Sequence, residues 1–127
     1  KTVALHGYGF AGGPFQPGEI VPLTRFWEAE REPDERLKVF VHLLDENGAL
    51  VAQTDVEPVG GLHPTSAWET GESVLDRHGV LLPDDLAPGT YTLTTGMYRL
   101  NDGTRLTVER AGAAAGDVIV LETIEVE

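Results

Sequence analysis

The sequence predicts an all-β domain, an antiparallel Greek-key β-sandwich of about eight strands with an immunoglobulin-like or jelly-roll topology. Short apolar segments recur along the chain, separated by clusters of Gly, Pro, Asn and Asp, as expected for strands joined by turns. A helical hydrophobic repeat is missing, and the one helix-like segment, residues 27–32, is stopped by Pro33. Strands must therefore build the fold.

The segment around Tyr91 is a further indication of a sandwich. Pro88 and Gly89 signal a turn, and Tyr91 follows at the start of an apolar strand. This pattern is typical of a tyrosine corner, in which the ring packs at the sandwich edge and the phenol bonds backbone a few residues upstream. We expect Tyr91, Pro88 and Gly89 to be structural and to support a long crossover connection.

The strands follow from alternating apolar residues and from turn signals. In chain order, we expect them at residues 3–10, 19–27, 36–45, 49–56, 73–82, 90–99, 104–110 and 117–126. The clearest core faces are Leu37, Val39, Val41 and Leu43 in one strand and Tyr91, Leu93, Thr95 and Met97 in another. Asn47-Gly48 and Asn101-Asp102-Gly103 predict tight hairpins. Gly7 and Gly9 indicate a bulge where an edge strand bends or changes sheets.

Size, charge and cysteine content limit the classes of function. The 127 residues suit a single domain, 1–127, that buries its own core without cysteines. Nine basic residues against 21 acidic ones give a net charge of −12, which argues against nucleic acid or an anionic membrane as a partner. No apolar run approaches the roughly 20 residues that span a bilayer, so we expect no direct membrane insertion by this segment. Because Lys1 leads straight into an apolar strand, we expect a domain cut from a longer protein.

The long segment 57–72 is the best candidate for a site, ahead of the loops 11–18 and 111–116. A connection of this length is often functional, but it can also pack as a cap over the fold. It contains Trp68, which together with Trp27 could offer an aromatic platform for a sugar ring. The alternative is that both indoles fill the core, and of the two we expect Trp27 to be a structural core residue. The exposure of Trp68 discriminates between these interpretations.

Polar side chains flank the same segment. Gln53 and Asp55 precede it, His63 lies within it, and Asp76 and Arg77 follow it, next to His78. If the two flanking strands are neighbours, these groups could converge with Trp68 on one ligand-binding face. In the alternative, Asp55 and Asp76 bind loop amides or pair with Arg77, because buried charges need such partners.

Catalytic, metal and cofactor sites are not predicted. Ser66 and Ser73 do not lie in a glycine-flanked nucleophile elbow, and the carboxylate pairs lie in solvated turns. The four histidines lack a metal-ligand spacing, and His42 is expected to be neutral and hydrogen-bonded. Segment 45–48 offers acidic oxygens to calcium, but a turn is the better interpretation.

A set of short motifs covers the chain from about Leu5 to Val126. They are Pro17-Gly18-Glu19, Phe26-Trp27, Val39-Phe40-Val41-His42-Leu43-Leu44-Asp45, Gln53-Thr54-Asp55, Pro58, Gly60-Gly61, Pro64-Thr65, Trp68, Gly71-Glu72, Asp76, Leu86-Ala87-Pro88-Gly89-Thr90-Tyr91 and Gly96-Met97-Tyr98. In these motifs the chain resembles a soluble β-sandwich domain appended to bacterial polytopic membrane proteins of the protein mannosyltransferase and aminoarabinose-transferase-like glycosyltransferase type.

The resemblance implies an extracytoplasmic accessory domain of the cell envelope, with any transferase chemistry in a membrane portion outside this chain. No catalytic or binding residues carry over, so the site expected above rests on loop position and residue chemistry alone. The partners implied are a glycan or the membrane portion of the parent protein.

Three hypotheses follow for the function. The first is a non-catalytic accessory domain that contacts carbohydrate through Trp68, His63, Gln53, Asp55, Asp76 and Arg77, which a partly exposed Trp68 would favour. The second is a structural or protein-interaction module, which a buried Trp68 and an apolar surface strip or open sheet edge would favour. The third, a stand-alone hydrolase, lacks a suitable constellation of residues.

Overall fold

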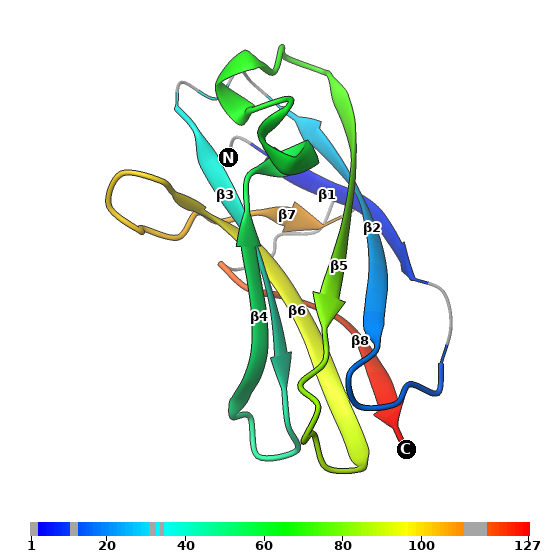
Figure 1. The fold of residues 1–127 in the computed structure, drawn as a ribbon. Helices are drawn as coiled ribbons and strands as arrows, with labels where there is room; N and C mark the ends of the chain where they lie inside the picture. Colours follow the sequence, from blue (N-terminus) through cyan, green and yellow to red (C-terminus); the bar gives the residue numbers. More distant parts are fainter. Residues whose placement is uncertain (1–2, 11–12, 31–32, 34, 111–116) are drawn as a thin grey trace.

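Two four-stranded sheets pack face to face in the computed structural model, which describes residues 3–10, 13–30, 33, 35–110 and 117–127 (Figure 1). Sheet 1 has the strand order β5-β2-β1-β7 and sheet 2 the order β4-β3-β6-β8. The strands are β1 (Val3–Phe10), β2 (Ile20–Ala29), β3 (Leu37–Leu44), β4 (Leu50–Val56), β5 (Ser73–Leu81), β6 (Gly89–Arg99), β7 (Glu109–Arg110) and β8 (Ile119–Val126). The predicted all-β sandwich is confirmed.

The topology is immunoglobulin-like rather than jelly-roll. The chain changes sheets after β2, β4, β5, β6 and β7. The order β4-β3-β6-β8 corresponds to the C′-C-F-G sheet of a variable-type immunoglobulin domain. β5, β2 and β1 correspond to strands E, B and A. Among the described residues, every pairing between two named strands is antiparallel except the short parallel contact of β1 with β7.

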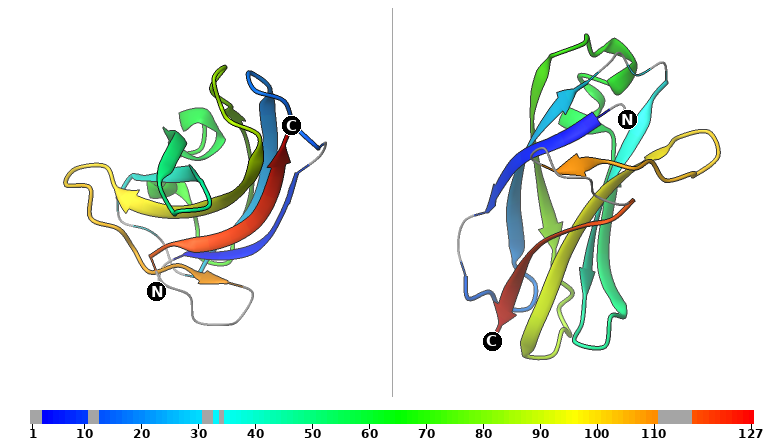
Figure 2. Two further views of the ribbon diagram at one scale, coloured as in Figure 1. Left: turned by 90° about the horizontal axis from the view of Figure 1, so that it is seen from below. Right: turned by 180° about the vertical axis from the view of Figure 1, so that it is seen from behind.

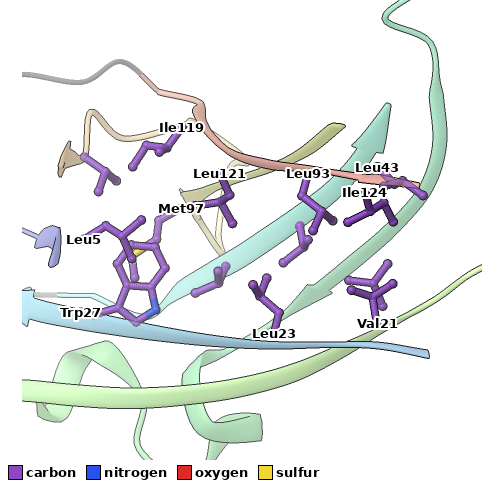
Figure 3. Packing of buried hydrophobic residues seen from close by; sticks show 14 of the residues in the cluster. Leu5, Val21, Leu23, Trp27, Leu43, Leu93, Met97, Ile119, Leu121 and Ile124 are labelled. Carbon is purple, nitrogen blue, oxygen red and sulfur yellow. The ribbon is translucent and has the colours of Figure 1, made fainter. Parts of the chain in front are cut away.

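The core lies between the two sheets and is built by their alternating side chains (Figure 3). Trp27 of β2 lies beside Leu5 of β1 and Met97 of β6. Further along β2, Leu23 faces Leu93 of β6, and all five side chains are at most 2% exposed. The two core faces predicted by alternation are correct. Burial of each large aliphatic side chain contributes about 1.5–3 kcal/mol to folding.

A tyrosine corner joins β5 to β6 across the sandwich. The phenol oxygen of Tyr91 donates a hydrogen bond to the carbonyl oxygen of Ala87 at 2.6 Å, and the ring is 6% exposed. The bond closes over Pro88 and Gly89 and fixes the direction in which β6 enters sheet 2. Tyr91 therefore has the structural contact that its position predicts.

Two details differ from the sequence prediction. The strand expected at 104–110 is only Glu109–Arg110, because residues 100–103 turn back and Arg105 instead bridges to Tyr98 at the end of β6 (Figure 2). The first strand has a bulge, since its pairing with β2 skips a residue between Leu5 and Gly7. It nevertheless stays in sheet 1, between β2 and β7, rather than at an edge.

The other loops are only partly described. Residues 11–12 of the first predicted loop and 111–116 of the third lie outside the described residues. Segment 57–72 contains two short 3-10 helices, η1 (Pro58–Gly61) and η2 (Thr65–Ala67), at one end of the sandwich (Figure 1). Within the described ranges, no helix is long and apolar enough to cross a membrane.

Candidate functional site

Segment 57–72 packs as a cap on the sandwich. Trp68 is 1% exposed, and its indole nitrogen donates to the carbonyl oxygen of His63 at 3.0 Å. Thr65 is also buried, where its hydroxyl donates to the carbonyl oxygen of Glu35 at 2.7 Å and accepts from the amide of Leu37 at 2.8 Å. The indole of Trp68 is thus part of the core and does not present a face to solvent.

His63, between the two 3-10 helices, contacts Glu72 at the end of the cap. The His63 Nε2 lies 2.6 Å from a carboxylate oxygen of Glu72, and both side chains are about one-third exposed. The other oxygen of Glu72 accepts from the amide of Glu69 at 2.9 Å. The hydrogen bond from the Glu69 amide lowers the pKa of Glu72 most, and the bond with His63 lowers it next, so that the pKa stays below its usual value. Both residues therefore stabilise the cap.

Asp76 is fully buried and links β5, β2 and the cap. One of its oxygens accepts from Arg25 Nη2 at 3.1 Å and from the Trp27 indole at 3.3 Å. The other accepts from the amide of Val59 at 2.9 Å. Val59 has a φ of 55°, a left-handed conformation that is strained for a β-branched residue. The cap is thus anchored through a backbone amide that Asp76 binds from inside the sandwich.

Both members of the Arg25–Asp76 pair are charged at neutral pH. Burial lowers the pKa of Arg25 to about 10, while the charge of Asp76 opposes that fall. Burial also acts to raise the pKa of Asp76, but the hydrogen bond with His78 first and the charge of Arg25 second outweigh it and leave the pKa lowered. The pair is an internal salt bridge that joins cross-strand neighbours of β2 and β5.

The outer face of sheet 2 carries a second group of polar and aromatic side chains. We call it the face cluster, and its members are Phe40, His42, Asp55, Tyr98 and Arg105. Phe40 and His42 alternate with the core residues of β3, and their ring centroids lie 4.6 Å apart. The Phe40 ring lies over Gly96, where a Cβ would come within 2.6 Å of it. The guanidinium carbon of Arg105 is 4.7 Å from the centroid of the same ring, and Phe40 is only 1% exposed.

The polar members of the face cluster offer both donors and acceptors. The Tyr98 phenol donates to one oxygen of Asp55 at 3.0 Å. The other Asp55 oxygen is buried and has no hydrogen-bond partner among the described residues. Burial first, and the Asp55 contact second, raise the pKa of Tyr98, so the phenol stays protonated. Burial lowers the pKa of His42, which favours a neutral imidazole.

The structure does not bring the predicted site residues together. The strands β4 and β5 flank the cap in sequence but belong to different sheets, so the condition for convergence is not met. Gln53 and Asp55 lie on sheet 2, where Gln53 is exposed and opposite His42. Trp68 and His63 belong to the cap, Asp76 is internal, and Arg77 is exposed on β5. The loop-amide alternative holds for Asp76, although its ionic partner is Arg25 rather than Arg77.

Several residues of these sites were not predicted from sequence. Arg25 lies between Leu23 and Trp27 in the core-facing alternation of β2, which is a signal that an internal charge needs a partner. Phe40 shares the outward face of β3 with His42 by the same alternation. Arg105 and Tyr98 gave no comparable signal, because their proximity to Phe40 depends on the turn after β6.

Asp45, at the β3–β4 turn, binds backbone amides through its carboxylate. Asp45 Oδ1 accepts from the amides of Asn47 and Ala49 at 2.8 and 2.9 Å, and Gly48 has a φ of 80°. Within the described part of the chain, no group of three or more His, Cys, Asp or Glu residues could hold a metal ion.

Large apolar side chains are exposed on the outer face of sheet 1. We call them the apolar strip, which consists of Ile20 and Phe26 of β2 and Leu75 and Leu81 of β5. Their exposed fractions run from 42% to 63%. Ile20 is directly opposite Leu81 and Phe26 opposite Leu75, so the four form two cross-strand pairs. Apolar side chains exposed on one face of a sheet are candidates for an interaction surface.

Comparison with known proteins identifies the fold but no family. No family model and no curated protein matches the chain. Among solved structures, the C-terminal domain of wzt is 16% identical and superimposes with a TM-score of 0.67, over 99% of this chain and 74% of that one. The alkylpurine DNA glycosylase AlkC of Pseudomonas fluorescens is 12% identical, with a TM-score of 0.55, and this chain spans 30% of its length. At these identities the likeness establishes a shared sandwich fold.

Proposed function

We propose that the protein is a non-catalytic accessory domain that contacts carbohydrate through the face cluster. The observation that carries the proposal is the Asp55–Tyr98 pair, in which one carboxylate oxygen is bonded and the other is buried without a partner among the described residues. A buried acceptor of this kind is satisfied when a ligand hydroxyl or a water molecule donates to it.

The chemistry around Asp55 suits a saccharide. A sugar presents hydroxyl groups that donate and accept, together with apolar C–H faces that pack on aromatic rings. Asp55 supplies an acceptor, Arg105 supplies donors, and the half-buried rings of His42 and Tyr98 supply apolar surface beside them. Gln53, on the rim, adds an amide that both donates and accepts.

The cellular context is proposed from the sequence resemblance. It favours an extracytoplasmic position in the cell envelope, on a membrane protein of the glycosyltransferase-like type. The shared fold with the C-terminal domain of wzt supports the idea that this sandwich serves as a domain of a longer chain. Its own role there would be to hold glycan or acceptor, while chemistry occurs elsewhere.

A glycan-array screen tests the proposal, with the 127-residue chain compared with two variants, with and without calcium. Asp55→Asn keeps the shape of the side chain but loses its charge, and Arg105→Ala removes the group above Phe40. We expect both to reduce binding to the same glycans by about tenfold or more, the effect of one charge-assisted hydrogen bond. Arg77→Ala, on the opposite sheet, is the matched control and should bind as the parent chain does.

The second candidate function is protein interaction through the apolar strip, which the burial of Trp68 and the exposure of the strip favour. In sedimentation at rising concentration, self-association through the strip would raise the mean mass, and Phe26→Ser with Leu75→Ser would abolish the rise. A constant monomer mass would exclude a second copy of this chain as the partner of the apolar strip. The partner would then have to be a different protein.

A further inference from the structure

Strand β5 forms an edge of sheet 1 that no other strand covers among the described residues. In an immunoglobulin sandwich, strand D takes the place beyond strand E. Here the chain runs from β4 through the cap directly into β5, so strand D is missing from the described part of the chain (Figure 1). A hollow of about 420 Å³ lies beside β5 and is lined by Val59, Leu75, Arg77 and His78. The edge of sheet 1 is therefore open.

Two hydrogen bonds at the ends of β5 show which of its backbone groups face this edge. The amide of Ala29 donates to the carbonyl oxygen of Glu72 at 3.0 Å. The amide of Leu82 donates to the carbonyl oxygen of Glu19 at 2.9 Å. The register of β2 with β5 is unbroken and hydrogen-bonded pairs alternate along an antiparallel ladder, so the even-numbered residues of β5 bond to β2.

The amides and carbonyls of the odd-numbered residues of β5 therefore point to the open edge. They have no backbone partner within the described ranges. A row of such unpaired groups on an edge strand is a template for pairing with another strand.

The outward face next to this edge carries little charge. Its side chains come from alternate residues of β2 and β5, namely Ile20, Pro22, Thr24, Phe26, Leu75, Arg77, Gly79 and Leu81. Arg77 is the one charged residue of this set, in a chain that has 21 acidic residues and a net charge of −12. A second copy of the chain can therefore approach here without bringing carboxylates together.

One antiparallel register fits β5 to the β5 of a second copy. It places Leu75 opposite Leu81 of the second copy, and it places Arg77 opposite Gly79, which has no side chain. The two-fold axis of this register passes through His78, and the residues that it pairs by hydrogen bonds are the odd-numbered ones. An axis at Arg77 would instead put two guanidinium groups directly opposite each other, where like charges are destabilising.

We propose that two copies of this chain pair through β5 in this register, so that sheet 1 continues across a dimer. Each cross-strand pair of the apolar strip then joins a pair of the second copy. The resulting row runs Phe26, Leu75, Leu81 and Ile20, the last two from the second copy, and the two-fold axis generates a second row. These rows withdraw from water side chains that are 42% to 63% exposed in the single chain.

The inference deepens the second candidate function, because it rests on self-association through the apolar strip and names the partner and the register. It does not depend on glycan binding by the face cluster, which is on the other sheet.

Disulfide formation tests the register, because the chain has no cysteine of its own. Leu75→Cys and Leu81→Cys, mixed in equal amounts and mildly oxidised, should form a mixed dimer, since hydrogen-bonded partners have Cα atoms about 5.5 Å apart. Neither variant alone should link, because its two cysteines would be about 20 Å apart along the strands. Ser73→Cys mixed with Leu81→Cys is the matched control, and preferential linkage in that mixture would overturn the register.

Arg77→Pro tests the strand pairing itself. The substitution removes an amide that faces the open edge and leaves the bonds to β2 in place, as proline on an edge strand does. The dimer loses one bond from each copy, so sedimentation should show association at least about tenfold weaker than for the unaltered chain. Arg77→Ala is the control, and its dimer should be at least as stable as that of the unaltered chain. Circular dichroism checks that both variants are folded.

The outcomes separate this inference from the functions proposed above. A monomer at every concentration would overturn it and leave the apolar strip to a different protein. Self-association that Arg77→Pro does not weaken would keep the strip as an interface and overturn the strand pairing. None of these results would alter the expected effect of Asp55→Asn on glycan binding.

Discussion

Arg25 and Asp76 face each other across β2 and β5 with their charges inside the sandwich, Nη2 and Oδ2 being 3.1 Å apart and both side chains 0% exposed. Asp76 also holds the cap through the amide of Val59. Asp76 thus links strands β2 and β5 to the cap, segment 57–72, which is the candidate site predicted from the sequence.

Loss of the Asp76 charge is expected to destabilise the fold strongly. In Asp76→Asn the Arg25 guanidinium remains buried without its counter-ion, and the expected loss is about 3–5 kcal/mol of unfolding free energy. Urea denaturation measures it. The double variant Arg25→Met with Asp76→Leu is the control, because it removes both charges and should lose less than Asp76→Asn alone. An equal or greater loss in the double variant would contradict this account.

Stability is expected to fall in mild acid. The pKa values of Asp76 and Glu72 are lowered in the folded chain from their ordinary 3.8 and 4.5. As the pH falls, the unfolded chain takes up protons on these two carboxylates before the folded chain does. The stabilisation is therefore complete above the ordinary pKa values and is lost as the pH falls through the lowered pKa values of the folded chain. Thermal unfolding at stepped pH should show a decline below about pH 4.5. Glu72→Gln should make the decline shallower, and an unchanged slope would contradict the role of Glu72.

Loss of the hydrogen bond in the tyrosine corner is expected to lower the unfolding free energy by the amount typical of one hydrogen bond. Tyr91→Phe keeps the ring and removes the hydrogen bond to Ala87, at an expected cost of about 0.5–1.5 kcal/mol. Chemical denaturation should show a lower midpoint with an unchanged slope. A cost near zero would mean that the bond does not stabilise the connection between β5 and β6.

Both indoles should be shielded from solvent. Trp27 and Trp68 are 0% and 1% exposed, so iodide should quench the fluorescence of the native chain weakly and that of the urea-unfolded chain strongly. Saturating glycan should leave the native quenching unchanged, because neither ring belongs to the proposed contact. Strong quenching of the native chain would mean that the cap opens and exposes Trp68.

Local signals predicted the fold well. The strands, the hairpin turn at Gly48 and the corner at Tyr91 depend on residues close in sequence, and alternation alone placed Leu43 and Met97 in the core. The strand at 104–110 was overestimated because its apolar residues pack in a turned-back segment that bridges β6 at Arg105.

The site could not be predicted in the same way. Asp55 and Asp76 are on consecutive strands, and sequence does not show that the chain changes sheets between them. Asp55 therefore meets Tyr98, which is 43 positions away, and Asp76 meets Arg25, which is 51 positions away. Contacts over such separations are fixed by topology. Arg25 was not predicted either, although its place in the core-facing alternation of β2 is a local signal for an internal charge.

Chemical-shift mapping of a bound glycan tests the central claim most directly. The strongest array glycan would be titrated into the labelled chain and the shifts of backbone and side-chain signals followed. The account predicts that the largest changes lie at His42, Asp55, Tyr98 and Arg105 on the outer face of sheet 2. Changes confined to the cap or to sheet 1, or no glycan-dependent change at all, would contradict it.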